Sequence, residues 1–270
     1  MTTTTETDKT TETDKTTETD KDTTSTETTT STDRSEDTVT DDRPEDATTA
    51  DTAVLALNHV SYAYTKGGKQ VIHDLSHTFE AGRVHAITGP SGAGKTTVLS
   101  LLSGLTSPTE GRILYKGKDL ERTNRYDFRS HDIGVIFQSF NLLPSLTVEE
   151  NIVLSMDASG KSFDRPKPEI VRELLAKVRL AEEYANERIL HLSGGEQQRV
   201  AIARALSYGP DVIIADEPTG NLDLATQDDI MRIFRELAHS EGKCVIIVTH
   251  SPDVARQSDE VFELAPLRRR

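Results

Sequence analysis

RVHAITGPSGAGKTTVLSLLSGL, residues 83–105, is the stretch that decides the fold. RVHAITG is a short apolar run typical of a buried strand, and GKTTVLSLLSGL has the apolar spacing of a helix. Between them, GPSGAGKT (residues 89–96) fills all four specified positions of the phosphate-loop pattern. The order strand, glycine-rich loop, helix predicts an α/β fold that holds a phosphate group at the edge of its sheet.

Each residue type in this loop has its own reason to be there. Gly89, Gly92 and Gly94 leave backbone amides free to wrap phosphate oxygens, and Lys95 offers a point charge to the β and γ phosphates. Thr96 offers a hydroxyl to Mg²⁺. A glycine-rich turn that binds nothing is the alternative, and the flanking strand and helix disfavour it. The remaining expected phosphate-site residues are Pro90, Ser91, Ala93 and Thr97.

A second chemical signal is DVIIADEP, residues 211–218. Four apolar residues form a buried strand that ends in two carboxylates, and ligand sites in parallel sheets lie at that end. Neighbouring residues on an extended chain point in different directions, so the two acids need not have the same task. Asp216 is expected to hold Mg²⁺ and Glu217 to orient or deprotonate the attacking water. Solvated turn acids are the alternative.

LSGGEQQR, residues 192–199, indicates a second anion cradle. Its glycines allow close backbone approach to a phosphate, and the helix that EQQRVAIARAL starts presents N-terminal amides. One set of nucleotide chemistry needs one cradle. The second cradle therefore implies a second nucleotide or a second copy of the chain.

The rest of the folded part alternates short β-rich runs with helical periods, which favours a mostly parallel sheet. Residues 133–138, 211–216 and 243–249 have the continuous apolar character of central strands. Residues 53–64 and the run from Arg112 to Leu120 predict a small antiparallel side sheet. Residues 142–195 are expected to form an inserted helical subdomain, and residues 225–240 an amphipathic helix. The predicted class is thus an α/β phosphate-loop NTPase with these two additions.

Composition sets residues 1–53 apart from the folded part. They hold 23 Thr, 16 Asp plus Glu and 5 Lys plus Arg, so they are expected to be a disordered acidic tail. The tail has a net charge of −11 out of −14, which leaves −3 on residues 54–270 and argues against nucleic acid as a partner. The expected ATP-dependent domain spans residues 54–265. Cys244, the single cysteine, lies in an apolar run and is expected to be a buried thiol.

Together, GPSGAGKT, LSGGEQQR and ADEPTGNLD, in this order, make the chain resemble an ATP-binding cassette (ABC) ATPase, the nucleotide-hydrolysing subunit of an ABC transporter. The resemblance covers roughly residues 54–265. It implies that Gln138 reaches Mg²⁺ and takes part in catalysis, and that His250 contacts the γ-phosphate. It also implies two ATP molecules in a head-to-tail dimer. It places Tyr64 on the adenine. It places the turn of Ser193, Gly194 and Gly195 at the γ-phosphate of the ATP held by a partner copy, and Asp223 in the loop that crosses to that copy.

Several of these assignments have an alternative. Tyr62 competes with Tyr64 for the adenine, and both would otherwise be half-buried strand aromatics. Asp223 is also placed to cap the following helix, and we expect it to do both. Gln138 and His250 have structural alternatives at the ends of their strands; Ser251 and Pro252 then begin a helix. The other histidines, including His59, His73, His77, His85 and His191, show no metal-ligand spacing and are expected to be solvated or core residues.

FQSFNLLPSLTVEENI, residues 137–152, narrows the resemblance to the ATPases of lipoprotein-releasing, macrolide-exporting, peptide-resistance and cell-division systems. In that group a separate membrane permease moves or senses the substrate. Its docking cleft is expected beside Gln138 and residues 139–154, where Phe140, Leu142 and Leu143 offer apolar contacts or pack in the core. Alternatives are an ABC ATPase without a transport role, and a nucleotide-binding regulatory module that does not turn over, which the joint presence of Glu217 and His250 disfavours.

No run approaches the roughly 18 to 20 apolar residues that span a bilayer. The expected location is therefore the cytoplasm, at the membrane face where a permease would hold the protein. The basic end, residues 266–270, includes three arginines that are expected to be solvated or to touch anionic lipid.

Overall fold

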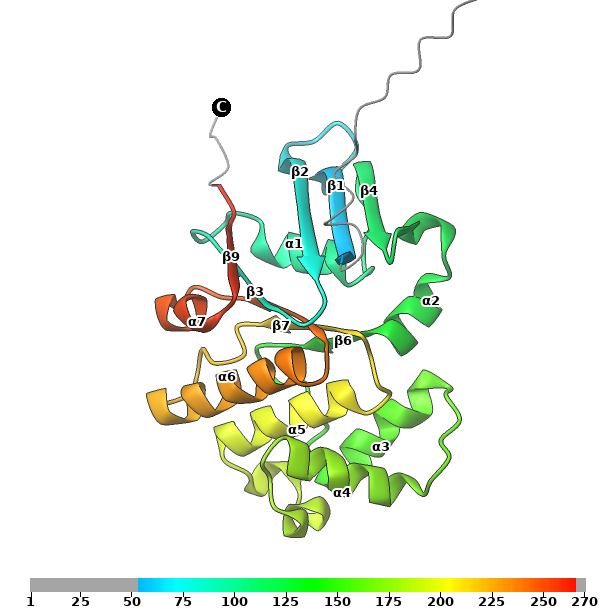
Figure 1. Ribbon diagram of the computed structural model, residues 1–270, viewed down its shortest axis with the longest axis vertical. Helices are drawn as coiled ribbons and strands as arrows, with labels where there is room; N and C mark the ends of the chain where they lie inside the picture. The colour runs from blue at the N-terminus through cyan, green and yellow to red at the C-terminus, as the bar shows by residue number, and fades with distance from the viewer. Residues whose placement is uncertain (1–52, 266–270) are drawn as a thin grey trace, which may run out of the picture. The chain divides into compact units, whose positions relative to one another are not determined.

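In the computed structural model, the described residues 53–265 form two β-sheets with helices packed around them (Figure 1). The predictions of an acidic tail and a basic C-terminal end concern residues 1–52 and 266–270, which lie outside the described part. Ala53, which the sequence assigns to the tail, is the first residue of strand β1. The predicted α/β class, with a parallel central sheet, an antiparallel sheet and inserted helices, is confirmed.

The antiparallel sheet has the strand order β2-β1-β4-β5. Its strands are β1 (Ala53–Ala63), β2 (Gln70–Glu80), β4 (Glu110–Tyr115) and β5 (Lys118–Asp119). The sequence did not indicate β2. This strand lies at the edge of its sheet and buries only Ile72 and Phe79 fully, so its polar residues mask the pattern of a strand.

The parallel sheet has the order β6-β7-β8-β3-β9, and each neighbouring pair runs parallel. Its strands are β3 (Val84–Thr88), β6 (Ile133–Ile136), β7 (Val212–Asp216), β8 (Cys244–Val248) and β9 (Glu260–Glu263). Strand β9 was also missed, because it has four residues and exposes two of them at the sheet edge.

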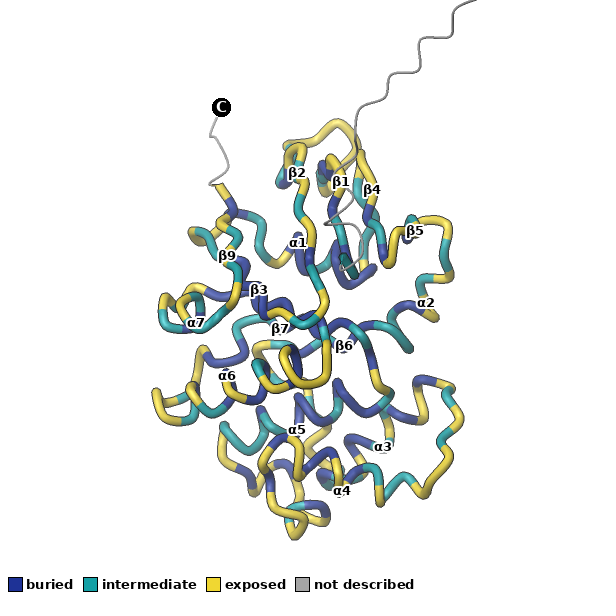
Figure 2. The backbone as a smooth tube through the Cα atoms, viewed as in Figure 1, coloured by how far each residue is buried: buried dark blue, intermediate teal, exposed yellow. Residues whose placement is uncertain are grey.

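Both faces of this sheet are covered, which explains its uninterrupted apolar strands. In β7, Val212 and Ile214 join one core cluster while Ile213 and Ala215 join the other. The first cluster contains helix α1 (Lys95–Leu102) and the antiparallel sheet; the second contains the longer helices. Figure 2 shows the central strands as the buried layer between them.

The remaining helices follow the sheet connections. Helix α2 (Arg125–Asp127) precedes β6, and α3 (Val148–Ser159), α4 (Lys167–Lys177) and α5 (Gly194–Leu206) lie between β6 and β7 in the chain. Helix α6 (Leu224–His239) joins β7 to β8, and α7 (Pro252–Gln257) joins β8 to β9. Short 3-10 or π turns occur at Leu120–Arg122, Phe128–Asp132, Glu182–Asn186 and Ile189–His191. Among residues 53–265 no helix is long and apolar enough to cross a membrane.

Candidate functional site at the edge of the parallel sheet

Four strands of the parallel sheet end at one edge, and chemically active residues follow each of them. The glycine-rich loop follows β3, Gln138 follows β6, Asp216 and Glu217 end β7, and His250 follows β8. Because the strands are parallel, their carboxyl ends lie on the same side of the sheet. The fold therefore brings together residues that are up to about 160 positions apart in the sequence.

The loop between β3 and α1 depends on glycine at three positions. Gly89, Gly92 and Gly94 have φ angles of +145°, +78° and +97°, a region that side chains disfavour. A Cβ atom on Gly89 would stand 2.8 Å from the carbonyl oxygen of Leu264, and one on Gly94 would stand 2.8 Å from Ile72 Cδ1. Ala93 is buried in the core and anchors the loop. The loop is thus held between β9 and β2.

The polar groups of this loop divide into exposed and packed ones. Pro90, Ser91, Gly92 and Thr96 are exposed. The Lys95 ammonium donates hydrogen bonds to the carbonyl oxygens of Gly89, at 2.8 Å, and Pro90, at 3.2 Å. These contacts hold the Lys95 ammonium over the loop. The backbone amides at the N-terminus of α1 face the same loop, so both the ammonium and the amides favour an anion there.

Thr97 differs from Thr96 in its surroundings. It is 5% exposed, and its hydroxyl lies 2.8 Å from the hydroxyl of Tyr64. Tyr64 is 69% exposed, whereas Tyr62 packs against the core and meets the Tyr64 ring edge to face, with centroids 5.2 Å apart. Of the two tyrosines, Tyr64 is the one with a free aromatic surface beside the phosphate-loop helix.

The two carboxylates at the end of β7 lie in different environments. Burial raises the pKa of Asp216, the neighbouring Glu217 charge raises it further, and Lys95 opposes both effects. The Glu217 side chain is 13% exposed and lies 2.7 Å from His250 Nδ1. The Thr249 hydroxyl donates to the second Glu217 oxygen at 3.3 Å. The structure thus brings Glu217 and His250 into direct contact.

Gln138, which follows β6, lies near the turn that follows Glu217. It is exposed, and its Nε2 atom stands 3.9 Å from the position of a Cβ on Gly220, whose other neighbours belong to Glu217. The three side chains predicted to hold Mg²⁺, those of Thr96, Gln138 and Asp216, offer a hydroxyl, an amide oxygen and a carboxylate. Oxygen donors of this kind are the ligands that Mg²⁺ prefers, so the donor set fits the ion.

The glycine turn of the second predicted cradle begins helix α5. Ser193 is its N-cap, and Ser193 and Glu196 form a reciprocal capping box. The hydrogen bond from Tyr184, followed by those from Ser193, holds the pKa of Glu196 below its usual value. In the described part of the chain, a Cβ atom added to Gly194 or Gly195 would have its nearest neighbours in Leu222 and Thr226, and not in residues 89–97.

Asp223 caps the next helix, as the sequence predicts. Its carboxylate accepts from the Thr226 amide at 3.0 Å and from the Thr226 hydroxyl at 2.6 Å. Thr226 is also the residue that a side chain on Gly195 would meet, at 2.7 Å. The capped start of α6 therefore lies directly beside the glycine turn of α5. Ser251 and Pro252 begin α7, also as predicted.

Two features of the site were missed from the sequence. Thr249, which holds the Glu217 carboxylate, was assigned only to a strand end. Arg204 donates to the carbonyl oxygen of Phe140 at 2.8 Å and also to that of Asn141, and burial lowers its pKa. Phe140 and Asn141 have positive φ angles of 59° and 51°, so Arg204 supports a bent backbone after Gln138. A helical arginine 64 residues away carries no local signal of this role.

The sequence shows no metal-ligand spacing among the histidines and predicts solvated or core residues, and His85 is a core residue. His77, His85 and Glu260 lie together on β2, β3 and β9, outside the edge described above. The buried Cys244 thiol is confirmed, and burial raises its pKa to about 12.

Comparison with known proteins adds independent information. The family model described as ABC transporter matches residues 72–220. An uncharacterized ABC transporter ATP-binding protein of Bacillus subtilis, YclH, is 42% identical over 207 residues, which are 77% of this chain and 91% of that protein. The lipoprotein-releasing system ATP-binding protein LolD 1 of Rhodopseudomonas palustris is 36% identical over 78% of this chain and 96% of that protein.

Solved structures resemble the fold as well. The dimeric structure of MJ0796, described as a bacterial ABC transporter cassette, has a TM-score of 0.70 and 35% identity, covering 78% of this chain and 94% of that one. A dimeric post-hydrolysis state of the same cassette with ADP and Pi has a TM-score of 0.71 and 34% identity, covering 80% and 97%.

Proposed function

The chain belongs to the ATP-binding cassette family and is an ABC transporter ATPase, and from this premise we propose that two copies close head to tail over two ATP molecules to drive a separate membrane permease. The permease is of the exporter or lipoprotein-releasing type. In this arrangement the phosphate loop of one copy and the α5 turn of the other enclose each ATP.

The observation that carries the dimer is the separation of the two cradles within one chain. Helix α1 packs in the core cluster on one face of the parallel sheet, and α5 packs on the other (Figure 1). The turn from Ser193 to Gly195 neighbours Leu222 and Thr226 rather than the phosphate loop. An ATP held by Lys95 therefore gains contacts from Ser193 and Gly195 only if they come from a second copy.

Binding of each ATP is divided among the residues of the loop and one aromatic. The backbone N–H groups from Ser91 to Thr97 and the Lys95 ammonium hold the phosphates. Tyr64 stacks on the adenine, a role that its 69% exposure supports. Asp223 lies beside the α5 turn and helps to present it to the partner's nucleotide.

Mg²⁺ belongs with the phosphates in this scheme. Thr96, Gln138 and Asp216 would hold it, and when bound it neutralises charge on the β and γ phosphates. The raised pKa of Asp216, caused by burial and by the Glu217 charge beside it, marks an acidic corner where a cation is favoured.

Hydrolysis is assigned to the Glu217 and His250 pair. Glu217 orients the attacking water and accepts its proton, and His250 contacts the γ-phosphate. The two side chains are 2.7 Å apart, and the Thr249 hydroxyl donates to the other oxygen of the carboxylate. These contacts orient the Glu217 carboxylate without a bound nucleotide. Gln138 joins the site from the β6 side.

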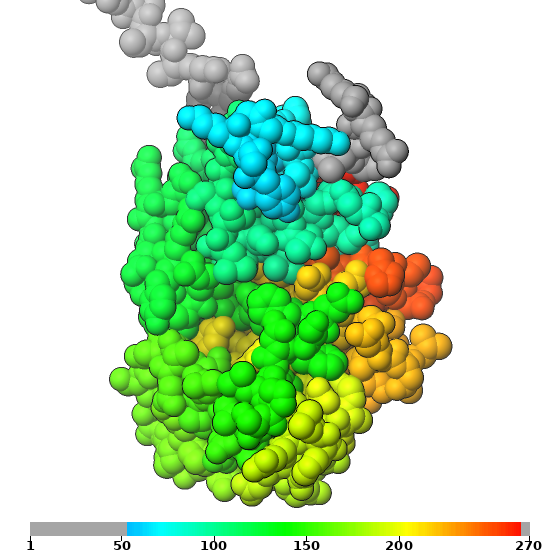
Figure 3. Space-filling view, turned by 180° about the vertical axis from the view of Figure 1, so that it is seen from behind, coloured from blue at the N-terminus to red at the C-terminus, as the bar shows by residue number. Residues whose placement is uncertain are grey.

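The permease is expected to dock on the segment after β6. Figure 3 shows this green segment on the surface of the molecule. Of its three apolar candidates, Phe140 and Leu142 pack against the core, while Leu143 is 45% exposed. The Arg204 side chain donates a hydrogen bond to the Phe140 carbonyl oxygen and so holds the backbone of the segment. Leu143 is therefore the candidate contact, and docking there would place the chain on the cytoplasmic face of the membrane.

The decisive test replaces Glu217 with Gln. This change keeps the size of the side chain but removes the base, so ATP turnover should fall at least about 100-fold while ATP binding is kept. Gel filtration with ATP and Mg²⁺ should then show a stable dimer, and the same variant with ADP should elute as a monomer.

The matched control combines Glu217→Gln with Lys95→Ala, which removes the phosphate-loop charge. It should remain monomeric with ATP because the nucleotide is no longer held. If Glu217→Gln alone stayed monomeric with saturating ATP, the head-to-tail scheme would be wrong.

A further inference from the structure

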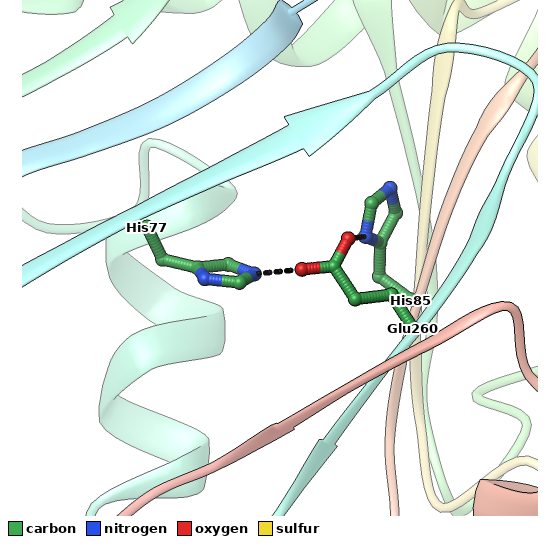
Figure 4. A group of neighbouring side chains, drawn as sticks. All are labelled: His77, His85 and Glu260. Carbon is green, nitrogen blue, oxygen red and sulfur yellow. Dashed lines mark ion pairs between the residues drawn. The ribbon is translucent and has the colours of Figure 1, made fainter.

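Three strands from two different sheets meet at a cluster of ligand-type side chains. His77 lies on β2 of the antiparallel sheet, and His85 and Glu260 lie on the adjacent strands β3 and β9 of the parallel sheet. In Figure 4 the Glu260 carboxylate lies between the two imidazole rings, with one oxygen turned toward each. His77 Nε2, His85 Nδ1 and a Glu260 oxygen all lie within 4.8 Å of one another.

The spacing is close to what one metal ion requires. The Glu260 oxygens stand 3.7 Å from His77 Nε2 and 3.2 Å from His85 Nδ1. Ligand atoms about 2.1 Å from a tetrahedral ion stand about 3.4 Å apart. The two distances to Glu260, each to a different oxygen, lie within about 0.3 Å of this value, and no separation among the three ligand atoms has to shorten by more than about 1.4 Å. The Glu260 side chain is 38% exposed, so it is free to adjust its own distances and leaves an entry path from solvent.

The two imidazole nitrogens have no other use in the described structure. Residues 53–265 provide no hydrogen-bond partner of acceptable geometry for His77 Nε2 or His85 Nδ1, although both atoms are buried. The His85 side chain is 1% exposed. Buried polar atoms are nearly always satisfied in native proteins, so an unpartnered pair that faces one carboxylate indicates a ligand.

The surroundings hold both rings in place. His77 stacks on Phe262, with centroids 4.2 Å apart, and meets Phe79 edge to face at 4.7 Å. His85 Nε2 lies 3.0 Å from the backbone nitrogen of Glu80 and 3.2 Å from its carbonyl oxygen, so the end of β2 fixes the orientation of the ring. In the tautomer that binds a metal through Nδ1, Nε2 is protonated and donates to this carbonyl. Metal-binding histidines are usually oriented by a hydrogen bond of this kind.

The competing explanation is that Glu260 accepts a hydrogen bond from each histidine. The 3.7 Å separation from His77 is too long for such a bond. The 3.2 Å contact between His85 Nδ1 and Glu260 also lacks the geometry of a hydrogen bond. A neutral imidazole with a free lone pair is the form that binds a metal.

We propose that His77, His85 and Glu260 form a binding site for one divalent transition-metal ion of the zinc class, with solvent as the fourth ligand. Two imidazole nitrogens and one carboxylate suit Zn²⁺ or Co²⁺ and do not suit Mg²⁺, which prefers oxygen. The ion joins β2 to β3 and β9. Leu264, which follows β9, covers Gly89 at the start of the phosphate loop, so the ion clamps the strands on which that loop rests.

The test uses the full chain after dialysis against a chelator, without nucleotide. Titration with CoCl₂ should give the visible absorption of a low-symmetry Co²⁺ site at one ion per chain, and ZnCl₂ should displace it. Zn²⁺ should also raise the unfolding temperature. His77→Gln and Glu260→Gln should each lower the affinity at least about 100-fold, since each removes a direct ligand.

His59→Gln is the matched control. His59 pairs with Asp74 at 2.8 Å on the same antiparallel sheet, but both side chains are exposed and no third ligand joins them. The His59→Gln variant should bind Co²⁺ and Zn²⁺ with the same affinity as the unaltered protein. Circular dichroism of the two ligand variants confirms that they are folded; His77 and Glu260 both reach solvent, so these conservative changes are tolerated. Absence of one-to-one binding, unchanged affinity in both ligand variants, or loss of binding in His59→Gln would overturn the proposal.

Discussion

Glu217 has a backbone conformation that L-amino acids rarely adopt, with a φ of +45°. Its amide donates to the Val248 carbonyl at 2.8 Å, so the neighbouring strand β8 imposes this conformation. A left-handed non-glycine residue costs on the order of 1–2 kcal/mol and persists where surrounding contacts enforce it. The strain turns the carboxylate away from the path of β7 and toward His250. The position of a single catalytic candidate is thus determined by a strand that lies some 30 residues further along the chain.

Cys244 provides a test at the scale of one residue. It is fully buried in β8, and its pKa of about 12 leaves about one thiolate in ten thousand at pH 8. We expect an aromatic disulfide reagent at pH 8 to label the native protein at least about 100-fold more slowly than the urea-unfolded protein. Because the chain has one cysteine, the absorbance change reports this thiol alone. Equal labelling rates in the two states would contradict the burial.

Two helices of the protein start with the same device. Thr147 and Glu150 form a capping box at α3, and Ser193 and Glu196 form one at α5. In each, the N-cap hydroxyl accepts an amide hydrogen bond and the glutamate accepts one in return. Only the second box adds two glycines, Gly194 and Gly195. The comparison separates what the α5 turn does for stability from what it does for ATP.

Replacement of each N-cap residue with Ala tests this separation. Thr147→Ala and Ser193→Ala should each reduce the free energy of unfolding by about 1 kcal/mol, measured by urea denaturation. In the Glu217→Gln background, only Ser193→Ala should weaken the ATP-dependent dimer in gel filtration, because the proposed dimer places Ser193, and not Thr147, at the partner's ATP. Equal dimer loss in both variants would show that a frayed helix, and not a lost phosphate contact, is the cause.

At the scale of the whole molecule, the two sheets are joined by more than apolar packing. Tyr115 and Lys116, at the end of β4, both donate to one carboxylate oxygen of Asp211, at 2.9 and 2.6 Å. Asp211 directly precedes β7, so this contact ties the antiparallel sheet to the strand that delivers Asp216 and Glu217. Burial, followed by the hydrogen bond to Asp211, raises the pKa of Tyr115. The phenol therefore stays protonated and remains a donor.

Tyr115→Phe should lower the free energy of unfolding by about 1 kcal/mol, because a partly buried hydrogen bond to a carboxylate is lost with little change in packing. Tyr126→Phe is the control, since Tyr126 is 61% exposed and its hydroxyl makes a longer bond of 3.3 Å to Ala158. It should stay within about 0.3 kcal/mol of the unaltered protein. A loss in Tyr115→Phe no larger than that of the control would contradict the tie between the sheets.

Local sequence was sufficient for the centre of the fold and for one half of the site. The structures of the glycine loop at residues 89–94 and of strands β3, β7 and β8 are determined by residues within a few positions of each segment. Loop conformation and two-faced burial are properties of a short segment, so they can be predicted from it. The phosphate loop and the acidic end of β7 follow from these segments alone.

The remainder depended on which strands lie side by side. Tyr62 and Tyr64 have equivalent patterns in the sequence, but Tyr62 lies in β1 and packs against the core, whereas Tyr64 follows the end of that strand and is exposed. Strands β2 and β9 are edge strands whose polar residues hide them, and they supply two of the three members of the metal-type cluster. His77, His85 and Glu260 meet because sheet order and register bring together positions up to 183 residues apart, and nothing within any one segment records that meeting.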